Sequence, residues 1–349
     1  MASVRKLAEK LGTSVATVSR ALNNHPEVSD ATKKRVLDAA SLMGYVPNVG
    51  KRSTTVIGLV YPEDPVRADY GAFESALLAG ILRGINEQKF DLKMVSIQRD
   101  KAPGETYSQF FTRKGLRGAI LRSFERTRGV CVDIASEGYP MVVVADRFEE
   151  PTVSFVNCES LGDSRRAVEH LYHLGHRRIG LVVHNVPDTD HRDRRQGYVQ
   201  ALAELGLTPD ASLIIETVAS MEGGAGSITR LLGLRQPPTA VYLTDPMATL
   251  GAIRRCQELA IQLPGDLSLV GFDDSDVRHH VWPPITAVCQ DAGMIGYEAA
   301  LWLTRRLAGK GPTTLRLVRQ TMLEVNRTTG APSRNPVRVL PDGTRVALD

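Results

Sequence analysis

The 349-residue sequence has few cysteines and no long apolar segment. Its four cysteines (131, 158, 256 and 289) are far apart, so we expect reduced, buried thiols and neither a disulfide framework nor a zinc site. The longest apolar runs, such as 141–145, have the length of a strand and fall far short of the roughly 20 residues that cross a bilayer. The first 30 residues contain no apolar segment typical of a secretory signal. These absences predict a cytoplasmic protein that is neither exported nor inserted into a membrane.

Patterns typical of enzymes are also missing. The Gly-Gly-Ala-Gly segment at 223–226 fits neither a dinucleotide-binding fingerprint nor a P-loop, and we predict a flexible loop there. The Ser-x-x-Lys match at 3–6 has no partner motifs and is interpreted as a helix cap. The histidines lack the spacing of metal ligands. We therefore expect no catalytic residue, no metal and no cofactor.

Positive charge is concentrated in one part of the chain. Residues 1–55 contain nine Lys and Arg but four Asp and Glu, whereas residues 56–349 contain 34 and 35. The chain has a formal net charge of +4, and all of this excess positive charge lies in the first segment. Such asymmetry predicts a basic module that binds a polyanion, attached to a nearly neutral body with another role.

The basic segment has the apolar spacing of three short helices. Apolar residues repeat at helical intervals in 4–11, Ser14 precedes a second helix predicted for 15–23, and Ser29 begins a third. Gly12 stands where a left-handed residue ends the first helix. Two short helices joined by a tight turn containing glycine form a helix-turn-helix pattern, for which the alternative is any small three-helix bundle.

The outer face of the second predicted helix favours the DNA-binding alternative. Residues 15–17 are small enough to enter a major groove. The hydroxyls of Thr17 and Ser19 are placed to reach phosphates, and Arg20 is able to bind guanine O6 and N7 with its guanidinium. The basic segment is therefore predicted to read double-stranded DNA.

The body alternates short apolar runs with helical stretches. This alternation predicts parallel sheets covered on both faces, hence an α/β fold. Two such units in tandem place a cleft between two lobes at the carboxyl ends of the strands, where α/β sheets bind ligands. The strand-like runs are 56–60, 92–95, 118–121, 141–144, 179–183, 240–243 and 267–270, and the clearest helical stretches are 73–88, 161–174 and 193–205.

Several motifs in fixed order carry a resemblance to a known family. The head contains Ala-Thr-Val-Ser-Arg-Ala-Leu-Asn at 16–23 and Gly-Tyr-Val-Pro-Asn at 44–48. The body contains Arg-Arg-Gln-Gly-Tyr at 194–198, Thr-Asp-Pro-Met at 244–247 and Gly-Phe-Asp-Asp at 271–274. Over about residues 3–330 the chain resembles the LacI/GalR family of bacterial transcription regulators. The resemblance implies a helix-turn-helix head followed by a two-lobed sensor similar to periplasmic sugar-binding proteins.

Carried over by position, the resemblance implies a set of DNA-binding residues. Val15, Ala16 and Arg20 would face bases, and Ser14, Thr17, Ser19 and Asn23 would hold the backbone. The linker departs from the family pattern, and from its own charges Lys51 and Arg52 are predicted to contact phosphates or to enter the minor groove.

The resemblance also implies an effector site between the lobes. Its predicted residues are Phe73, Asp146, Arg194, Asp245 and Asp273. Carboxylates and a guanidinium suit a polyhydroxylated ligand, because each is able to hold two hydroxyls, and an aromatic ring packs on the apolar face of a sugar. The alternative for any one of them is a structural ion pair, and Asp273 in particular is placed to fix its own turn.

The chain departs from the family pattern in three places. Cys158 and Glu159 stand where the family usually has Asp-Asn, and residues 89–90 are Lys-Phe in place of Gly-Tyr. The linker is several residues shorter, with Lys51 and Thr54 in place of alanine and leucine. Because threonine is a poor wedge, we predict that the linker does not intercalate between base pairs; a wedge formed by Val49 is the alternative.

These observations predict a DNA-binding transcription regulator, namely a repressor that binds a palindromic operator as a homodimer and responds to a small molecule of carbohydrate type. The alternative is a solute-binding component of a transport or sensing system. The predicted parts are a head at 1–48, a linker at 49–55, a two-lobed body at 56–330 and a tail at 331–349. The tail contains a Pro-Asp-Gly turn between two short apolar segments, which favours a small hairpin.

Overall fold

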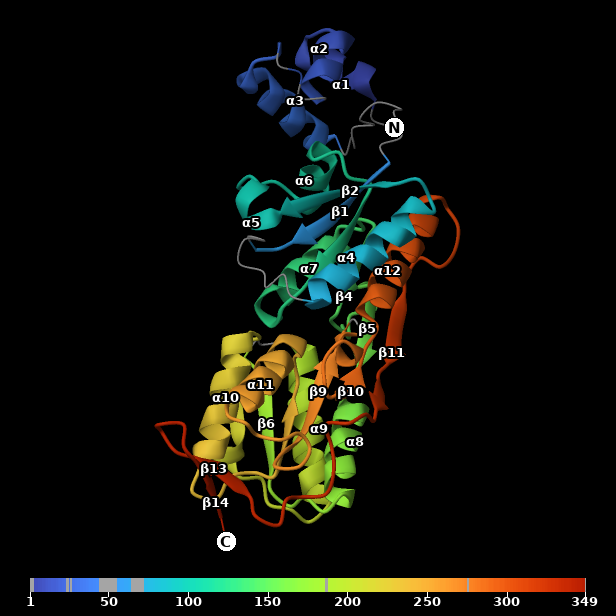
Figure 1. The fold of residues 1–349 in the computed structure, drawn as a ribbon. Coiled ribbons are helices and arrows are strands. Elements are labelled where there is room, and N and C mark those ends of the chain that lie inside the picture. The colour runs from blue at the N-terminus through green and yellow to red at the C-terminus, as the bar shows by residue number, and fades with distance from the viewer. Residues whose placement is uncertain are drawn as a thin grey trace.

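A computed structural model describes residues 3–22, 25, 27–43, 55–63, 72–185, 188–274 and 276–348. Within these ranges the chain forms a small helical head and a two-lobed body (Figure 1). The α/β architecture predicted from the sequence is confirmed. Asn23 and the linker residues 49–54, with Lys51 and Arg52, lie outside the described residues. None of the described helices has the length and hydropathy needed to cross a membrane.

The head consists of α1 (Val4–Leu11), α2 (Val15–Leu22) and α3 (Asp30–Leu42). The Ser3 hydroxyl accepts a hydrogen bond from the Lys6 amide at the start of α1, and Gly12 ends that helix in the left-handed conformation, with φ of 61°. Leu7, Val18 and other apolar side chains form its small core. The head therefore folds around the apolar faces predicted from the sequence.

Lobe 1 is built on a six-stranded parallel sheet in the order β11-β5-β4-β3-β1-β2. Apolar cores cover both of its faces. Its strands are β1 (Val56–Tyr61), β2 (Asp91–Ser96), β3 (Gly118–Arg122), β4 (Met141–Val144), β5 (Phe155–Glu159) and β11 (Arg316–Gln320). Its helices are α4 (Ala72–Asn86), α5 (Ile97–Asp100), α6 (Tyr107–Arg113), η2 (Glu125–Thr127), α7 (Arg128–Ser136) and α12 (Ala292–Leu307).

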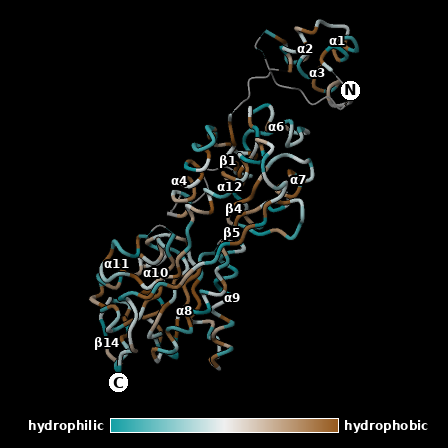
Figure 2. The backbone as a smooth tube through the Cα atoms, turned by 90° about the vertical axis from the view of Figure 1, so that its right-hand side faces the viewer, coloured by the Kyte–Doolittle hydropathy of each residue, from teal (hydrophilic) through white to brown (hydrophobic). Residues whose placement is uncertain are grey.

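Lobe 2 repeats this plan with the order β12-β10-β9-β8-β6-β7, and only β12 runs antiparallel to its neighbour. Its strands are β6 (Ile179–His184), β7 (Ile214–Thr217), β8 (Ala240–Leu243), β9 (Ser268–Asp273), β10 (Thr286–Cys289) and β12 (Met322–Glu324). Its helices are α8 (Leu161–His173), α9 (Thr189–Glu204), η3 (Ala211–Leu213), α10 (Met221–Gly233), α11 (Pro246–Glu258) and η4 (Val277–His279). The hydrophobic segments run through the interior of both lobes (Figure 2).

The chain crosses between the lobes three times, from β5 to α8, from β10 to α12 and from β11 to β12. Each crossing joins one sheet to the other lobe, so neither lobe is a continuous segment. Because the strands of each sheet run parallel, the loops after their carboxyl ends gather at one edge. The hydrogen bonds between the lobes, described below, place these two edges against each other.

The glycine-rich segment at 223–226 is not a loop, and the prediction made for it is wrong. These residues lie inside α10, which packs along α11. A Cβ atom on Gly224 would lie 1.9 Å from the carbonyl oxygen of Ala248, and one on Gly251 would lie 2.0 Å from that of Met221. The glycines therefore permit two helix backbones to approach closely, and this packing outweighs the low helix propensity of glycine.

The tail folds back onto lobe 2 as a hairpin of β13 (Val337–Val339) and β14 (Arg345–Ala347). Gly343 adopts φ of 86° in the turn, and the Asp342 carboxylate accepts a hydrogen bond of 2.9 Å from the Thr344 amide. The side chains at both ends of β13 are buried in the apolar core beside α10. The tail is thus part of the packing of lobe 2.

Candidate DNA-binding helix and effector site

Helix α2 presents an exposed face opposite its buried one. Val18 and Ala21 pack inward, whereas Val15 is 46% exposed. Among the predicted DNA-binding residues, Ser14, Ala16, Ser19 and Arg20 are also exposed and Thr17 is half-buried. This arrangement leaves the residues assigned to base and phosphate contacts on one accessible surface.

Two of these residues also hold the helix in place. The Ser14 hydroxyl accepts a hydrogen bond of 3.0 Å from the Thr17 amide and lies 2.8 Å from the Thr17 hydroxyl, so it caps α2. Arg20 faces Glu27 at 3.5 Å, with side chains 58% and 67% exposed. An ion pair this exposed contributes little, so the Arg20 guanidinium is available to another acceptor.

At the carboxyl edge of lobe 1, the buried Arg122 side chain is paired with an acid and packs against two aromatic rings. Arg122, at the end of β3, donates through Nε to Glu74 Oε1 at 2.6 Å. Its guanidinium carbon lies 5.1 Å from the ring centre of Phe73 and 5.3 Å from that of Phe124. Burial opposes the charge, but the Glu74 carboxylate outweighs burial and raises the pKa of Arg122. Phe73, predicted from the sequence, thus belongs to a wall completed by three residues that the sequence analysis did not select.

Asp146, which follows β4, joins the two lobes. Its Oδ1 atom accepts hydrogen bonds of 2.5 Å from Arg128 of lobe 1 and 2.5 Å from the Thr189 hydroxyl at the start of α9 in lobe 2. A second bridge runs at 2.6 Å from Arg147 of lobe 1 to Asp193 of lobe 2. Asp146 therefore lies at the predicted place, and its contacts hold the lobes together.

Arg194 is the buried cation of lobe 2. It is 4% exposed on α9, donates through Nη1 to the Thr244 carbonyl at 2.8 Å and stacks 3.6 Å from the ring centre of Phe272. Within the described part of the chain no carboxylate lies within ion-pair distance of its guanidinium, and its Nε has no hydrogen-bond partner. Nη1 also lies 3.4 Å from His191 Nε2, so the unpartnered Nε is the donor that stays available for a ligand.

Other buried polar atoms around Arg194 also lack partners among the described residues. They are Ser160 Oγ, Asp190 Oδ1, Thr244 Oγ1, Gln290 Oε1 and the side-chain amide of Asn157. They come from the middle of β5 and the residue after it, from the residues that follow β8 and β10, and from the start of α9. Because at least about nine in ten buried polar groups in proteins are hydrogen-bonded, a cluster of exceptions points to a site for a polar ligand.

The carboxyl groups in this cluster have unusual acidities. Burial raises the pKa of Asp190 to about 7 and that of Asp274 to about 7, although the Arg194 charge opposes both shifts. Burial also acts on Asp188, but the bonded His191 outweighs it and lowers the pKa of that carboxyl. At neutral pH the site thus holds groups able to donate as well as accept hydrogen bonds.

The two remaining predicted residues hold their own backbone. Asp245 caps α11 by accepting a hydrogen bond of 2.9 Å from the Ala248 amide. The Asp273 carboxylate accepts bonds from Arg278, at 3.1 Å from the amide and 2.9 Å from the guanidinium. For Asp273 these contacts match the turn-fixing alternative. The neighbouring Asp274, absent from the predicted set although it belongs to the motif at 271–274, instead accepts from the Gln290 amide at 2.6 Å beside Arg194.

The departures from the family pattern at 158 and 159 are accommodated where the chain crosses into lobe 2. Glu159 Oε1 accepts hydrogen bonds of 2.6 Å from the Leu161 amide and 3.1 Å from the Gly162 amide, so it caps α8. Cys158 is buried, and burial raises the pKa of its thiol to about 12. No group of three His, Cys, Asp or Glu side chains in the described ranges is arranged to hold a metal ion.

Comparison with known proteins places these features in a family. Residues 4–48 match the lacI family of bacterial regulatory proteins, and residues 168–329 match the periplasmic binding protein-like domain. The HTH-type transcriptional repressor CytR of Escherichia coli (strain K12) is 31% identical over 319 residues, which covers 88% of this chain and 91% of the relative. The HTH-type transcriptional regulator CelR of Thermobifida fusca is 28% identical over 330 residues, covering 93% and 97%. A solved complex of the transcriptional regulator CelR with cellobiose has a TM-score of 0.68 and 28% identity, covering 94% of this chain and all of that one.

Proposed function

Because this chain belongs to the LacI family of bacterial regulatory proteins and is therefore a DNA-binding transcription regulator, we propose that a small polyhydroxylated ligand bound between its lobes controls its affinity for operator DNA. A catalytic or transport function is not favoured, since the relatives across nearly the whole chain are regulators. The proposed ligand is a carbohydrate and the proposed activity is repression.

The cluster of unpartnered polar atoms around Arg194 carries the proposal. Hydroxyl groups both donate and accept, and the cluster offers both kinds of partner: the Arg194 Nε donor and the Thr244 and Gln290 oxygens. The aromatic rings that flank Arg122 supply an apolar wall across the same interface. A relative in this family, CelR, is known in complex with cellobiose, which supports a sugar as the ligand class.

On the DNA side, α2 is proposed to enter the major groove. Arg20 with Val15 and Ala16 would face bases, while Ser14, Thr17, Ser19 and Asn23 hold the backbone. Lys51 and Arg52 of the linker are proposed to contact phosphates.

One head of this size offers few contacts, so a homodimer with two heads on a palindrome is the proposed binding unit. Trp282, which is 70% exposed on lobe 2, is the kind of side chain that anchors such an interface.

A thermal-shift screen of sugars and nucleosides against the full chain tests the ligand site. A ligand present at 100 times its Kd stabilises the folded state by about 2.7 kcal/mol, which moves the melting temperature by degrees. The Arg194→Ala variant should show no shift with the same compound and should keep operator binding in its absence. Equal ligand titrations of variant and wild type by calorimetry would remove Arg194 from the site.

Substitution of Arg20 tests the assignment of α2. Arg20→Ala should cost roughly 1–3 kcal/mol of operator affinity and relax selectivity at one position of each half-site. Lys34→Ala, which removes a charge from the head outside α2, serves as the control and should leave selectivity unchanged. The measurement is selection of sites from a randomised duplex pool, and an unchanged consensus in Arg20→Ala would overturn direct readout by this residue.

A further inference from the structure

The edge of lobe 1 that joins the linker carries an excess of positive charge. Residues 87–117 contain seven Lys and Arg against four Asp and Glu, whereas the rest of residues 56–349 contains 27 against 31. We name six of these cations the basic edge: Lys89, Lys93, Arg99, Arg113, Lys114 and Arg117. None of them takes part in the effector site described above.

The topology of the sheet places this edge beside the entry of the linker. The first residues of β1 and β2 pair with each other, Val56 with Asp91, and the start of β3 pairs with Ile57. The amide of Arg117 donates to the Val56 carbonyl at 2.9 Å. The amino ends of these parallel strands therefore share one edge, at which the chain arrives from the head, while the carboxyl ends face lobe 2. In the ribbon view and in the tube view turned by 90°, α6 is the labelled body helix nearest the head (Figures 1 and 2).

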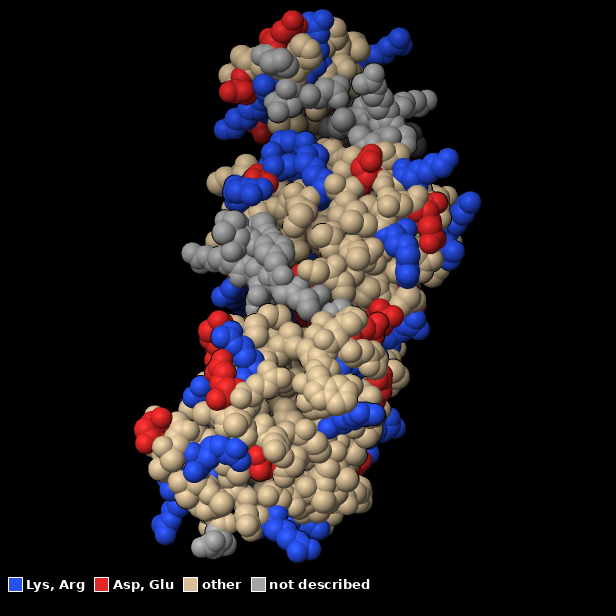
Figure 3. All heavy atoms as spheres, in the orientation of Figure 1, with Lys and Arg blue, Asp and Glu red and all other residues tan. Residues whose placement is uncertain are grey.

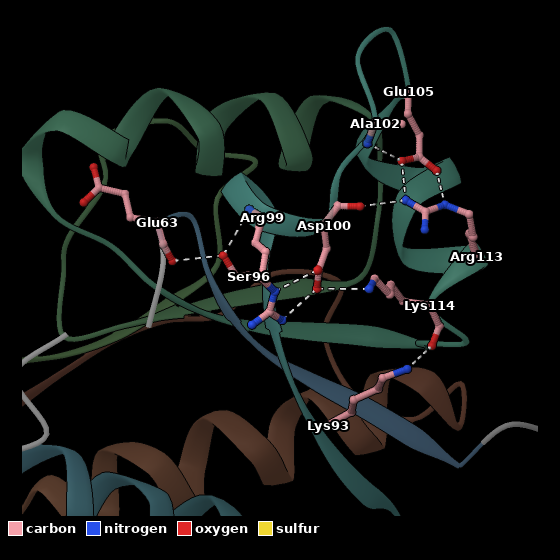
Figure 4. A network of polar contacts seen from close by, with 9 residues as sticks. All are labelled: Glu63, Lys93, Ser96, Arg99, Asp100, Ala102, Glu105, Arg113 and Lys114. Carbon is pink, nitrogen blue, oxygen red and sulfur yellow. Dashed lines mark hydrogen bonds and ion pairs between the residues drawn. The ribbon is translucent and has the colours of Figure 1, made fainter. Parts of the chain in front are cut away.

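Of the four acids in residues 87–117, Glu87 and Asp91 are exposed, whereas Asp100 and Glu105 are largely buried and paired with the cations. Asp100 is paired with Arg99 at 2.8 Å and with Lys114 at 3.0 Å, and Glu105 is paired with Arg113 at 2.7 Å (Figure 4). The carboxylates are 16% and 12% exposed, whereas the two arginines are 56% and 37% exposed. Hydrogen bonding from Arg99 holds the pKa of Asp100 well below its usual range, so the Asp100 carboxylate stays ionised at neutral pH.

The cations are therefore held in place before any partner arrives. Lys93, exposed on the outermost strand of the sheet, donates to the Lys114 carbonyl at 3.0 Å, and Arg113 donates to the Asp100 carbonyl at 2.9 Å. In the space-filling view, Lys and Arg atoms gather at the end of lobe 1 next to the head (Figure 3). Side chains already fixed by neighbours lose less conformational entropy when they bind, which favours a polyanion with evenly spaced charges.

We propose that the basic edge is a second DNA-contacting surface, which binds phosphates of the duplex close to the bases read by α2. This proposal rests on the DNA-binding function of the head and extends it to the sensor body. The chain from Asn48 to Val56 spans at most about 29 Å even when fully extended. A head seated on DNA therefore keeps the basic edge near the same duplex, where its positive charge is attracted to the backbone.

The test compares two triple variants of the full chain. Lys89→Gln/Lys93→Gln/Lys114→Gln removes three charges from the basic edge and leaves both arginine–carboxylate pairs intact. Arg230→Gln/Arg254→Gln/Arg334→Gln removes three exposed charges elsewhere in the body and is the matched control. Binding to a 40-base-pair duplex of random sequence is measured by fluorescence anisotropy at 50–200 mM KCl. The slope of log K against log salt changes by about 0.9 for each phosphate that the protein no longer neutralises.

We expect the basic-edge variant to lower the slope by about one to three per chain and to weaken binding at 50 mM KCl at least tenfold. The control should match wild type, and circular dichroism should show both variants folded. Lys89→Arg/Lys93→Arg/Lys114→Arg, which keeps the charges, should restore the slope. A basic-edge slope equal to that of wild type, or an equal loss in the control, would overturn the second surface while leaving the head's function intact. Failure of wild type to bind any duplex would instead overturn the DNA-binding function.

Discussion

The two lobes follow the same plan, yet they supply different kinds of groups to the interface between them. In lobe 1 the buried arginine is satisfied: Arg122 is paired with Glu74 and stacked between aromatic rings. In lobe 2 the buried arginine is not: Arg194 has a free Nε, and oxygens of Thr244 and Gln290 lack partners beside it. This difference indicates that Arg122 belongs to a rigid wall, whereas Arg194 and the unpartnered polar atoms near it, including the Asn157 amide on β5 of lobe 1, are the groups able to recognise a ligand.

The comparison also separates stability from function. A buried ion pair that loses one member leaves an uncompensated charge, which is strongly destabilising. A buried polar atom that has no protein partner costs desolvation free energy in the ligand-free fold, so its removal should weaken ligand binding without destabilising the protein. Substitutions in the two lobes should therefore have opposite profiles.

The largest expected effect is on stability, in lobe 1. Glu74→Gln should lower the free energy of unfolding by about 3 kcal/mol or more, because the Arg122 charge stays buried without its partner. The Glu74→Leu/Arg122→Met double variant removes both charges and should recover most of that loss. Urea denaturation followed by circular dichroism measures both. A loss below about 1 kcal/mol in Glu74→Gln would contradict the difference drawn between the lobes.

A smaller effect is expected on the pH dependence of lobe 2. Burial raises the pKa of Asp190 to about 7 in the folded chain, well above the value of about 3.9 in an unfolded one. The contribution of Asp190 to the free energy of unfolding therefore falls as pH rises from about 4 to 7. Asp190→Asn cannot lose a proton and should gain stability relative to wild type across that window.

Melting temperatures of the ligand-free chain at pH 5, 6, 7 and 8 measure this difference. Buried histidines act in the opposite sense, since burial lowers the pKa of His184 to about 4, so each variant is compared with wild type at the same pH. Asp133→Asn, at an exposed site of lobe 1, is the control and should follow wild type. A constant offset between Asp190→Asn and wild type at all four pH values would argue against a proton on Asp190.

The smallest expected change in stability is that of Thr244→Val. The Thr244 hydroxyl is buried and unpartnered, so its removal should not lower the free energy of unfolding. The affinity for the sugar found by the thermal-shift screen should fall about fivefold, since a ligand hydrogen bond contributes about 1 kcal/mol.

The control is Thr304→Val in lobe 1, where the buried hydroxyl already donates to the Ala300 carbonyl at 2.9 Å. That variant should lose stability and keep its affinity for the sugar. Calorimetry and denaturation of the two variants together measure both quantities. A destabilised Thr244→Val with normal affinity would reverse the assignment of this oxygen.

Much of the architecture was predictable from local patterns. The three helices of the head, the alternating strands and helices of the body and the positions of Phe73 and Arg194 follow from apolar spacing and from motifs of the family. The glycines at 223–226 were misinterpreted, because a glycine run looks alike in a loop and at a close helix contact. Only the distance between α10 and α11 distinguishes the two.

The sequence by itself determined the basic head, the tandem α/β body and the family, because these depend on composition, periodicity and the order of motifs. The tertiary structure alone decided which charges are paired. Glu74 and Arg122 are 48 residues apart, and Asp146 and Thr189 are 43 apart, so no local pattern links them. It also showed that Asp245 and Asp273 hold their own backbone while Asp190 and Asp274 lie beside Arg194. Whether a buried polar group is satisfied depends on partners that only folding brings within hydrogen-bond distance.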